Sequence, residues 1–124
     1  MEEKLKKLLN NAYAPYSGYR VSAIARCNDT LYTGVNVENA SYGATICAER
    51  VAITKAIADG NKEIDEMFIM VDSEKLGTCC FICRQVISEF FKEDSYITCY
   101  NNNGEFKKFQ VKELCPYPFN KENL

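Results

Sequence analysis

Apolar residues three and four positions apart predict that the chain opens with an amphipathic helix. They are Leu5, Leu8, Leu9, Ala12 and Tyr13. A Pro-Tyr-Ser-Gly cluster at residues 15–18 ends this periodicity. Two runs rich in apolar residues follow at 21–27 and 31–37, separated by Asn28 and Asp29. The residue types of these runs, and the polar turn between them, predict a pair of strands.

The chain then alternates between helical and strand patterns. A polar, glycine-containing loop at 39–45 leads into residues 47–58, which are rich in Ala and Ile. This segment is predicted to form a helix that ends at Asp59 and Gly60, a plausible helix C-cap. The continuous apolar run at 67–71 has the pattern of a buried strand.

Another helix is predicted after the loop at 73–78, because five residues share one helical face. They are Cys80, Cys83, Ile87, Phe90 and Phe91. Runs at 96–100 and 105–110 surround an Asn-rich turn and predict a last strand pair, after which an irregular tail begins at Cys115. The order α-β-β-α-β-α-β-β predicts an α/β fold, a mixed sheet covered by helices, in a single domain of residues 1–124.

The composition narrows the class of partner. A chain of 124 residues, 47% of them hydrophobic, fits one compact domain. It has no run of 18 apolar residues that would predict a membrane span, and its charged N-terminus lacks the apolar segment of a secretory signal. The net charge is −2, whereas polynucleotide-binding proteins usually carry a basic stripe. We therefore expect a small-molecule partner, and neither a nucleic acid polymer nor a membrane.

Seven cysteines and no histidine limit the kinds of metal site that the chain can build. Without a signal segment, so many thiols indicate a reducing compartment and hence a cytoplasmic protein. Cys47 is followed two residues later by Glu49, and Cys80 and Cys83 form a C-x-x-C pair downstream. Three thiolates can hold zinc and leave its fourth tetrahedral position open to water. C-x-E followed by C-x-x-C is the layout of zinc-dependent base deaminases.

The absence of histidine also leaves proton transfer to a carboxylate, and Glu49 is the nearest candidate in the sequence. Three thiolates and a hydroxide would outweigh the charge of Zn²⁺. Arg50 and the N-termini of the two helices are placed to offset this excess negative charge. The alternative for Cys80 and Cys83 is a pair of core cysteines in an amphipathic helix. For Arg50 the alternative is an ordinary exposed arginine.

Four sequence blocks resemble those of the small, homotetrameric cytidine deaminases. They are AYAPYS at 12–17, GVNVENASYG at 34–43, CAER at 47–50 and CRQV at 83–86. They follow the family's order and span nearly the whole chain. The resemblance implies a five-stranded mixed sheet of the cytidine deaminase type, a homotetramer and one zinc ion per subunit. It also implies hydrolysis of cytidine or deoxycytidine to uridine or deoxyuridine and ammonia, a reaction of pyrimidine salvage.

The resemblance gives roles to the residues of the two cysteine motifs. Cys47, Cys80 and Cys83 match the family's zinc ligands, and Glu49 matches its proton shuttle. Arg50 matches an arginine that hydrogen-bonds the ligand thiolates.

Further residues match those that contact the substrate. Asn36 and Glu38 match residues that hold the ribose 3′-hydroxyl, and their spacing places both on one face of a strand. The alternative for this pair is a solvent-exposed strand face. Ala48 matches a residue whose backbone meets the pyrimidine.

Three aromatic residues match positions around the family's pocket. Tyr19 stands where the family has a phenylalanine that packs against the nucleoside. Tyr42 and Phe119 match aromatics that neighbouring subunits contribute. Ordinary core packing is the alternative for all three.

The chain departs from the family's pattern at four positions, which predicts a pocket of altered shape. Cys79 replaces a proline before the second cysteine motif, and Phe81 stands inside it where the family has glycine. Arg20 and Ser22 replace the usual proline and glycine. The Phe81 ring is expected either to point away from the pocket and fill space, or to point into it and restrict the substrate.

Two other functions compete with cytidine deamination. In the first, the same reaction acts on a modified nucleoside or a nucleoside antibiotic, as in the related blasticidin-type deaminases. In the other case the chain is a non-catalytic, zinc-stabilised module whose fourth ligand comes from another cysteine. The cysteines available for this are Cys27, Cys79, Cys99 and Cys115.

Overall fold

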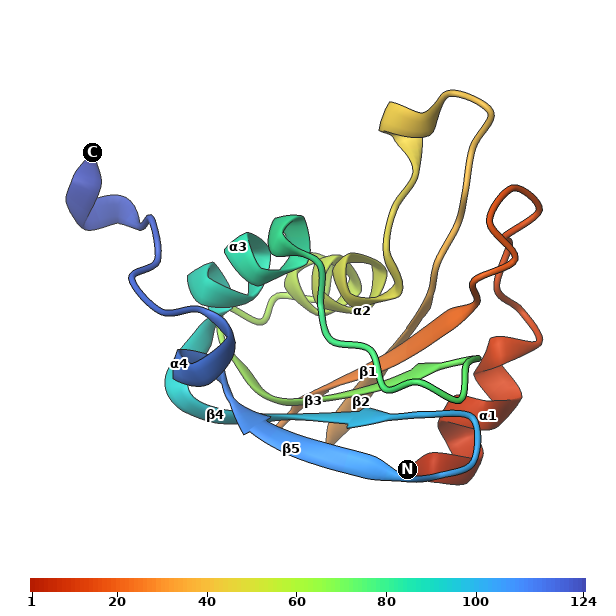
Figure 1. Ribbon diagram of the computed structural model, residues 1–124. Coiled ribbons are helices and arrows are strands. Elements are labelled where there is room, and N and C mark those ends of the chain that lie inside the picture. The colour runs from red at the N-terminus through yellow and green to blue at the C-terminus, as the bar shows by residue number, and fades with distance from the viewer.

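The computed structural model describes residues 1–124, and its strands form one five-stranded sheet (Figure 1). The strands are β1 (Val21–Cys27), β2 (Thr30–Val35), β3 (Ile64–Val71), β4 (Phe91–Tyr100) and β5 (Phe106–Gln110). Their order across the sheet is β2-β1-β3-β4-β5. β3 and β4 run parallel, and all other neighbours are antiparallel. The predicted mixed sheet is therefore confirmed.

Helices cover both faces of this sheet (Figure 1). The α-helices are α1 (Glu2–Leu9), α2 (Ala48–Ala58), α3 (Phe81–Phe90) and α4 (Val111–Leu114). Two single-turn 3₁₀-helices, η1 (Tyr42–Ala44) and η2 (Lys121–Asn123), complete the chain. α2 and α3 lie together on one face, and α1 lies on the other. None of these helices is long and apolar enough to cross a bilayer.

The two faces of β1 contribute to two separate hydrophobic cores. Ala23 and Ala25 pack into the larger core beneath α2 and α3, whereas Ile24 packs against Leu5 and Leu9 of α1. Successive strand residues point to opposite faces, so a strand that is covered on both sides carries apolar residues on both faces. Full burial of a Leu or Ile side chain contributes about 1.5–3 kcal/mol.

Several element boundaries differ from the sequence-based prediction. α1 ends at Leu9, so Ala12 and Tyr13 lie beyond it, and β2 ends at Val35 rather than at residue 37. The extended chain continues past β2 only through isolated bridges, in which Val37 pairs with Tyr13 and Ile46. Apolar periodicity can continue past the last backbone hydrogen bond of a helix or strand, so it does not determine where the element ends.

The short helix α4 was not predicted. It has four residues and begins after Gln110, whose side chain forms a reciprocal capping box with Glu113. Gln110 N donates a 2.9 Å hydrogen bond to Glu113 Oε1. This capping is the only local signal, because four residues are too few to show a helical period.

Gly34 of β2 allows α2 to lie directly against the sheet. A Cβ atom at this position would lie 2.4 Å from Ala48 O and 2.7 Å from Ala52 N. Both are backbone atoms of α2, which cannot move aside as a flexible side chain could. The position of the first turn of α2 therefore depends on the absence of a side chain at residue 34.

Gly34→Ala is expected to lower the free energy of unfolding by about 1–3 kcal/mol, the usual cost of overpacking a core. Urea denaturation of the purified variant would measure the change. Gly43→Ala is the matched control, because a Cβ there would meet nothing within 4 Å and the backbone needs no positive φ. Equal stability of the two variants would contradict the close approach of α2.

Candidate functional site

Three cysteine side chains meet where α2 and α3 begin. Cys47 and Cys80 are the N-cap residues of α2 and α3, and Cys83 lies one turn into α3. Their three Sγ atoms lie within 4.8 Å of one another, and Cys47 Sγ is 3.8 Å from Cys80 Sγ. Two helix N-termini thus converge on the thiols, and their partial positive charge can offset negative charge at this point.

The geometry of the three thiols fits a zinc ion. Two sulfurs that each lie about 2.3 Å from a tetrahedral zinc are separated by about 3.8 Å, which is the distance found between Cys47 and Cys80. Thiolates are also the ligands preferred in structural and catalytic zinc sites that lack histidine. No other cysteine belongs to the cluster. Three protein ligands leave one tetrahedral position open, which is the arrangement of catalytic zinc sites.

Hydrogen bonds make the three thiols unequal. The bond with Cys83, supported by Arg50 and Cys80, lowers the pKa of the Cys47 thiol. The same bond with Cys47, together with burial, raises the pKa of the Cys83 thiol. Arg50 Nη2 donates to Cys47 Sγ at 3.5 Å, and Cys83 N donates to Cys80 Sγ at 3.4 Å. A bound metal would displace the proton that this cluster retains.

Glu49 lies in the first turn of α2, two residues after Cys47. Its side chain is buried, and burial raises the pKa of its carboxyl to about 7. A carboxyl that titrates near neutral pH can both accept and release a proton. Next to it, Arg50 Nε is buried without a hydrogen-bond partner.

Cys47, Cys80 and Glu49 all line one cavity of about 310 Å³. Its apolar wall is formed by side chains from β1, β3 and the loops beside them, namely Tyr19, Val21, Ile46, Ile69 and Val71. Its polar lining includes Asn36 and Glu38. A volume of this size suits a small molecule. The metal cluster and the buried carboxylate therefore face a space that can hold a ligand.

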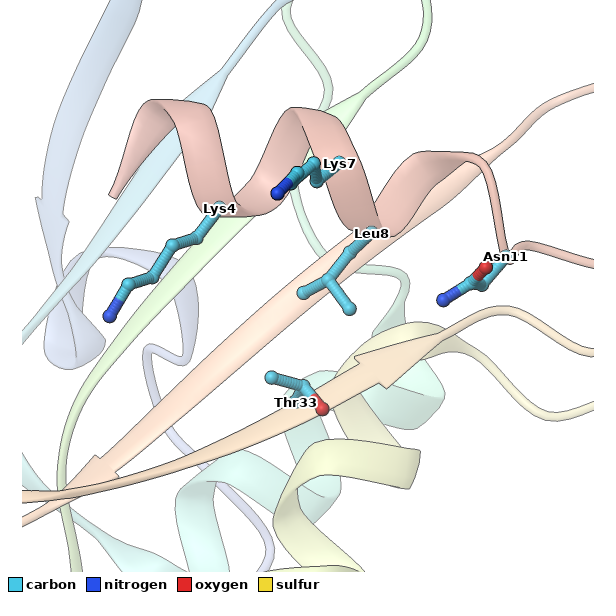
Figure 2. Close-up of a pocket in the computed structure, with 5 residues that line it drawn as sticks. All are labelled: Lys4, Lys7, Leu8, Asn11 and Thr33. Atoms are coloured by element: carbon cyan, nitrogen blue, oxygen red, sulfur yellow. The ribbon is translucent and has the colours of Figure 1, made fainter.

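A second hollow, of about 380 Å³, lies between α1 and β2 (Figure 2). Lys4, Lys7, Leu8, Asn11 and Thr33 line it. It offers ammonium, amide and hydroxyl groups, but no thiol or carboxylate. Although it is larger than the cavity beside the cysteines, it lacks the groups that acid–base or metal chemistry requires.

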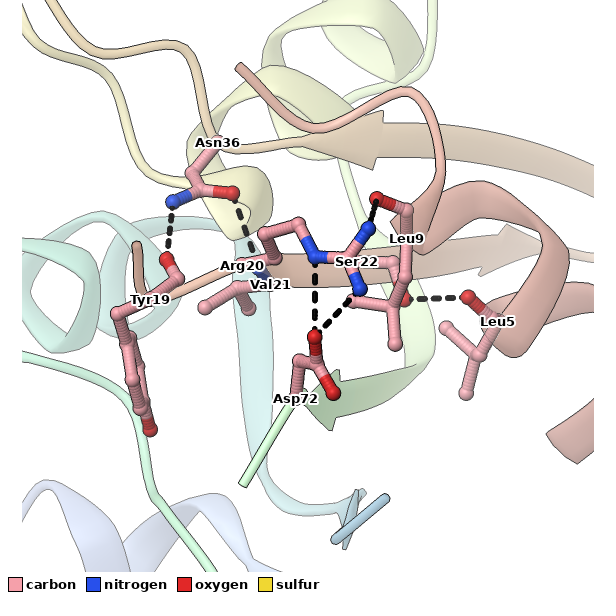
Figure 3. Close-up of polar contacts among 8 residues, drawn as sticks. All are labelled: Leu5, Leu9, Tyr19, Arg20, Val21, Ser22, Asn36 and Asp72. Atoms are coloured by element: carbon pink, nitrogen blue, oxygen red, sulfur yellow. Dashed lines mark hydrogen bonds and ion pairs between the residues drawn. The ribbon is translucent and has the colours of Figure 1, made fainter. Parts of the chain in front are cut away.

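Asn36 uses its side chain to hold the segment that enters β1. Its Oδ1 accepts a 2.9 Å hydrogen bond from Val21 N, and its Nδ2 donates a 2.8 Å bond to Tyr19 O (Figure 3). One Nδ2 hydrogen remains for a ligand. Asn36 and Glu38 lie beyond the end of β2, so the predicted strand does not carry them, but both line the cavity.

Glu38 is fixed by the loop before β1. Its Oε1 accepts hydrogen bonds from Tyr16 N at 3.0 Å and Ser17 N at 3.1 Å, and its Oε2 accepts one from Ser17 Oγ. The Ser17 hydroxyl and amide lower the pKa of this carboxyl. No sequence pattern predicts this role for Tyr16 and Ser17. The only signal for them was their place in the AYAPYS block.

Comparison with known proteins decides the family. A family model for the cytidine and deoxycytidylate deaminase zinc-binding region matches residues 1–99. The chain is 38% identical to a cytidine deaminase of Sporosarcina psychrophila, over 96% of this chain and 88% of that one. It is 32% identical to a cytidine deaminase of Mycoplasma genitalium, over 96% and 92%. The chain belongs to the zinc-binding cytidine deaminase family.

The fold of this cytidine deaminase family member agrees with solved structures. Cytidine deaminase from Burkholderia pseudomallei matches with a TM-score of 0.88 and 35% identity, over 94% of each chain. A blasticidin-S deaminase of Bacillus cereus is a more distant relative, 27% identical over 79% of this chain and 74% of that one. The sequence blocks that resembled cytidine deaminases therefore identified the family correctly.

The three aromatic residues that match pocket positions of cytidine deaminases lie in different places. Tyr19 lines the cavity, with 43% of its surface exposed. Tyr42 is 77% exposed and faces a neighbouring hollow that also includes Glu38. Phe119 is 57% exposed in the C-terminal tail, where its carbonyl accepts a 2.8 Å bond from Gln85 Nε2. Core packing, the alternative for all three, is wrong within the chain.

Both expectations for Phe81 are wrong. Its ring is 76% exposed, so it neither fills a core space nor enters the cavity. The first turn of α3 directs Cys80 and Cys83 toward the cluster, which leaves Phe81 facing solvent. The Arg84 guanidinium lies over the ring, 4.3 Å from its centroid. Arg84 also donates a 2.8 Å hydrogen bond to Cys79 O and so anchors the loop before Cys80.

Cys79 is buried and stays outside the metal cluster. Burial raises the pKa of its thiol well above the ordinary value, so the group is a neutral thiol at physiological pH. The departure from proline at this position therefore adds no ligand. The zinc-stabilised module would need a fourth cysteine beside the cluster, and Cys27, Cys79, Cys99 and Cys115 all lie outside it.

Proposed function

We propose that the protein deaminates cytidine and deoxycytidine by hydrolysis, releasing uridine or deoxyuridine and ammonia, with one zinc ion per chain. The observation that carries the proposal is the shared cavity of about 310 Å³, onto which Cys47, Cys80 and Glu49 all open. The relatives named cytidine deaminase, similar over most of their length, support the choice of substrate. A reaction of pyrimidine salvage in the cytoplasm suits this chemistry and the seven free thiols.

Cys47, Cys80 and Cys83 would hold the zinc ion, which when bound supplies Lewis-acid activation of water. The carboxylate of Glu49 takes a proton from the attacking water and delivers it to N3 of the pyrimidine. Protonation at N3 makes C4 more electrophilic. Glu49 then takes the remaining proton from the hydroxyl on C4 and passes it to the exocyclic amine, as the C4 carbonyl forms and the bond from C4 to that nitrogen breaks. C4 gains the oxygen of water and loses ammonia, and one carboxylate serves as base and acid in turn.

The other cavity residues would orient the nucleoside. Glu38, already held by the loop before β1, accepts a hydrogen bond from the ribose 3′-hydroxyl, and Asn36 offers its remaining Nδ2 hydrogen. Ala48 opens α2, so its backbone N–H has no acceptor within the helix and is available to the pyrimidine. Tyr19 and the apolar wall contact the ring of the base.

The direct test is release of ammonia from cytidine by purified, zinc-loaded protein. We expect stoichiometric uridine, and a panel containing deoxycytidine, modified cytidines and a cytosine-containing nucleoside antibiotic would rank the substrates. If only the antibiotic were turned over, the protein would be a deaminase of the blasticidin type. If fully zinc-loaded protein turned over no nucleoside, the result would favour the non-catalytic, zinc-stabilised module.

Arg50→Ala is expected to reduce kcat/KM about tenfold or more while zinc content falls less, because excess negative charge then remains on the thiolates. The reason lies in the 3.5 Å contact between Arg50 Nη2 and Cys47 Sγ. Kinetics and metal analysis on one preparation would measure both quantities. Lys55→Ala, on the exposed side of the same helix, is the control. If the kinetics of both variants equalled those of the wild type, Arg50 would be an ordinary arginine with no part in the reaction.

We further propose that the protein is a homotetramer whose pockets receive Tyr42 and Phe119 from neighbouring subunits. The exposure of both rings within one chain supports this, because large exposed aromatic side chains are common at interfaces. Deletion from Pro118 onward, or Phe119→Ala alone, is expected to lower kcat/KM about tenfold, equivalent to about 1.4 kcal/mol of lost binding. Tyr117→Ala is the control, because this aromatic residue of the same tail does not match a pocket position of the family. Light scattering that shows a fully active monomer would contradict the proposal.

A further inference from the structure

We propose that Arg20 is a positioning residue for the substrate pocket: its ion pair with Asp72 fixes the segment that presents Tyr19 to the cavity. The inference rests on the proposed function, since Tyr19 would contact the nucleoside. It concerns a residue that faces away from the cavity and carries none of the chemistry.

The segment entering β1 divides its side chains between two faces. Tyr19 and Val21 line the cavity. Arg20 and Ser22 point to the opposite side, toward α1 and Asp72, as Figure 3 shows. This alternation follows from the extended backbone. The same four residues therefore form part of the pocket wall on one side and its attachment to the rest of the protein on the other.

Arg20 joins three parts of the chain. Its Nε and Nη2 donate to Asp72 Oδ2 at 3.0 and 2.5 Å, and its Nη1 donates to Leu9 O at 3.5 Å. Asp72 N in turn donates to Arg20 O at 2.9 Å. The Arg20 guanidinium holds the pKa of the Asp72 carboxyl below its usual range, so this carboxyl stays ionised at neutral pH. Beside it, the buried Ser22 Oγ donates to Leu5 O at 2.8 Å.

Tyr19 needs this support because it lies before the first residue of β1. It has no place in the sheet, and its backbone is held by side chains: Tyr19 N donates to Ser17 Oγ at 3.0 Å, and Tyr19 O accepts from Asn36. Its hydroxyl lies 2.6 Å from where a Cβ of Gly77 would be. The ring therefore extends from the entrance of β1 to the loop that leads to Cys80.

Loss of the ion pair would free the segment on the side away from the cavity and allow the Tyr19 ring to move. The three cysteines and Glu49 lie at the N-terminal ends of α2 and α3 and not in this segment. The effect should consequently fall on substrate binding rather than on the chemical step. KM rises while kcat stays nearly constant, which is the signature of lost uniform binding when chemistry is slow.

The test compares Arg20→Ala, Asp72→Ala and the double variant with Arg26→Ala. Arg26 is the matched control, since it pairs with Glu66 at 3.2 Å at the other end of β1 and has a similarly exposed side chain, 34% against 40% for Arg20. We expect either change at the first pair to raise KM for cytidine about fivefold with kcat within about twofold. The double variant should be no worse than the single variants, and Arg26→Ala should leave KM unchanged.

A second measurement does not require turnover. In protein labelled with 3-fluorotyrosine, the ¹⁹F resonance of Tyr19 is assigned by its loss in Tyr19→Phe. This resonance should shift or broaden in Arg20→Ala and not in Arg26→Ala. An unchanged resonance together with an unchanged KM would overturn the inference and leave a purely structural ion pair. If wild-type protein does not turn over cytidine, the proposed function fails, while the resonance still tests the positioning of Tyr19.

Discussion

Glu49→Gln is expected to lower kcat by roughly 10⁴-fold or more, because positioned acid–base groups contribute about 10²–10⁴-fold and this one serves several proton transfers. Glutamine has nearly the same shape but cannot exchange a proton at neutral pH. The side chain is buried in the first turn of α2 and only 5% exposed, so solvent replaces its proton transfers poorly. Zinc content and thermal stability should stay close to those of the wild type.

Steady-state kinetics, metal analysis and circular dichroism on the same preparation would separate the chemical loss from misfolding. Glu89→Gln, an exposed glutamate of α3, is the matched control and should retain full activity. If Glu49→Gln turned over cytidine at more than about a hundredth of the wild-type rate, the lower end of the range for such groups, Glu49 would not be the proton shuttle.

Cys80→Ser and Cys83→Ser should each lose zinc and activity together. Changing a group that only supports a metal ligand costs 10–100-fold in affinity, so the loss of a ligand should reach at least about 100-fold. Cys27→Ser is the control, because Cys27 is buried like Cys83 but contacts Glu63 O instead of the cluster. Chelator competition with a zinc-sensitive dye would measure the affinities. Zinc lost from Cys27→Ser but kept in Cys80→Ser would contradict the ligand assignment.

Much of the fold was predictable because its signals are local. The bounds of β1 follow from a run rich in apolar residues between two turns, and the helix after Cys47 follows from its composition and from Gly60 beyond its end. The cysteine motif could be recognised for a related reason. Two short spacings, C-x-E and C-x-x-C, contain the ligands and the carboxylate, so only the approach of the two helices had to come from the fold.

The features that sequence reasoning missed depend on contacts between distant residues. Glu38 is held by Ser17, 21 positions away, and Arg20 pairs with Asp72, 52 positions away. No pattern within a window of sequence records such a pairing. Phe81 was missed for another reason: the positions of Cys80 and Cys83 turn it away from the cluster, but only the fold shows that no other element covers its ring.

The three cysteines come from two helices that are separated along the chain by the whole of β3. An ion bound at Cys47, Cys80 and Cys83 would therefore link two segments that are far apart along the polypeptide. Because the site is assembled only in the folded chain, the free energy of zinc binding adds to the free energy of folding. A cell that runs short of zinc would then lose part of the folded protein, and degradation would follow the metal supply as closely as catalysis does.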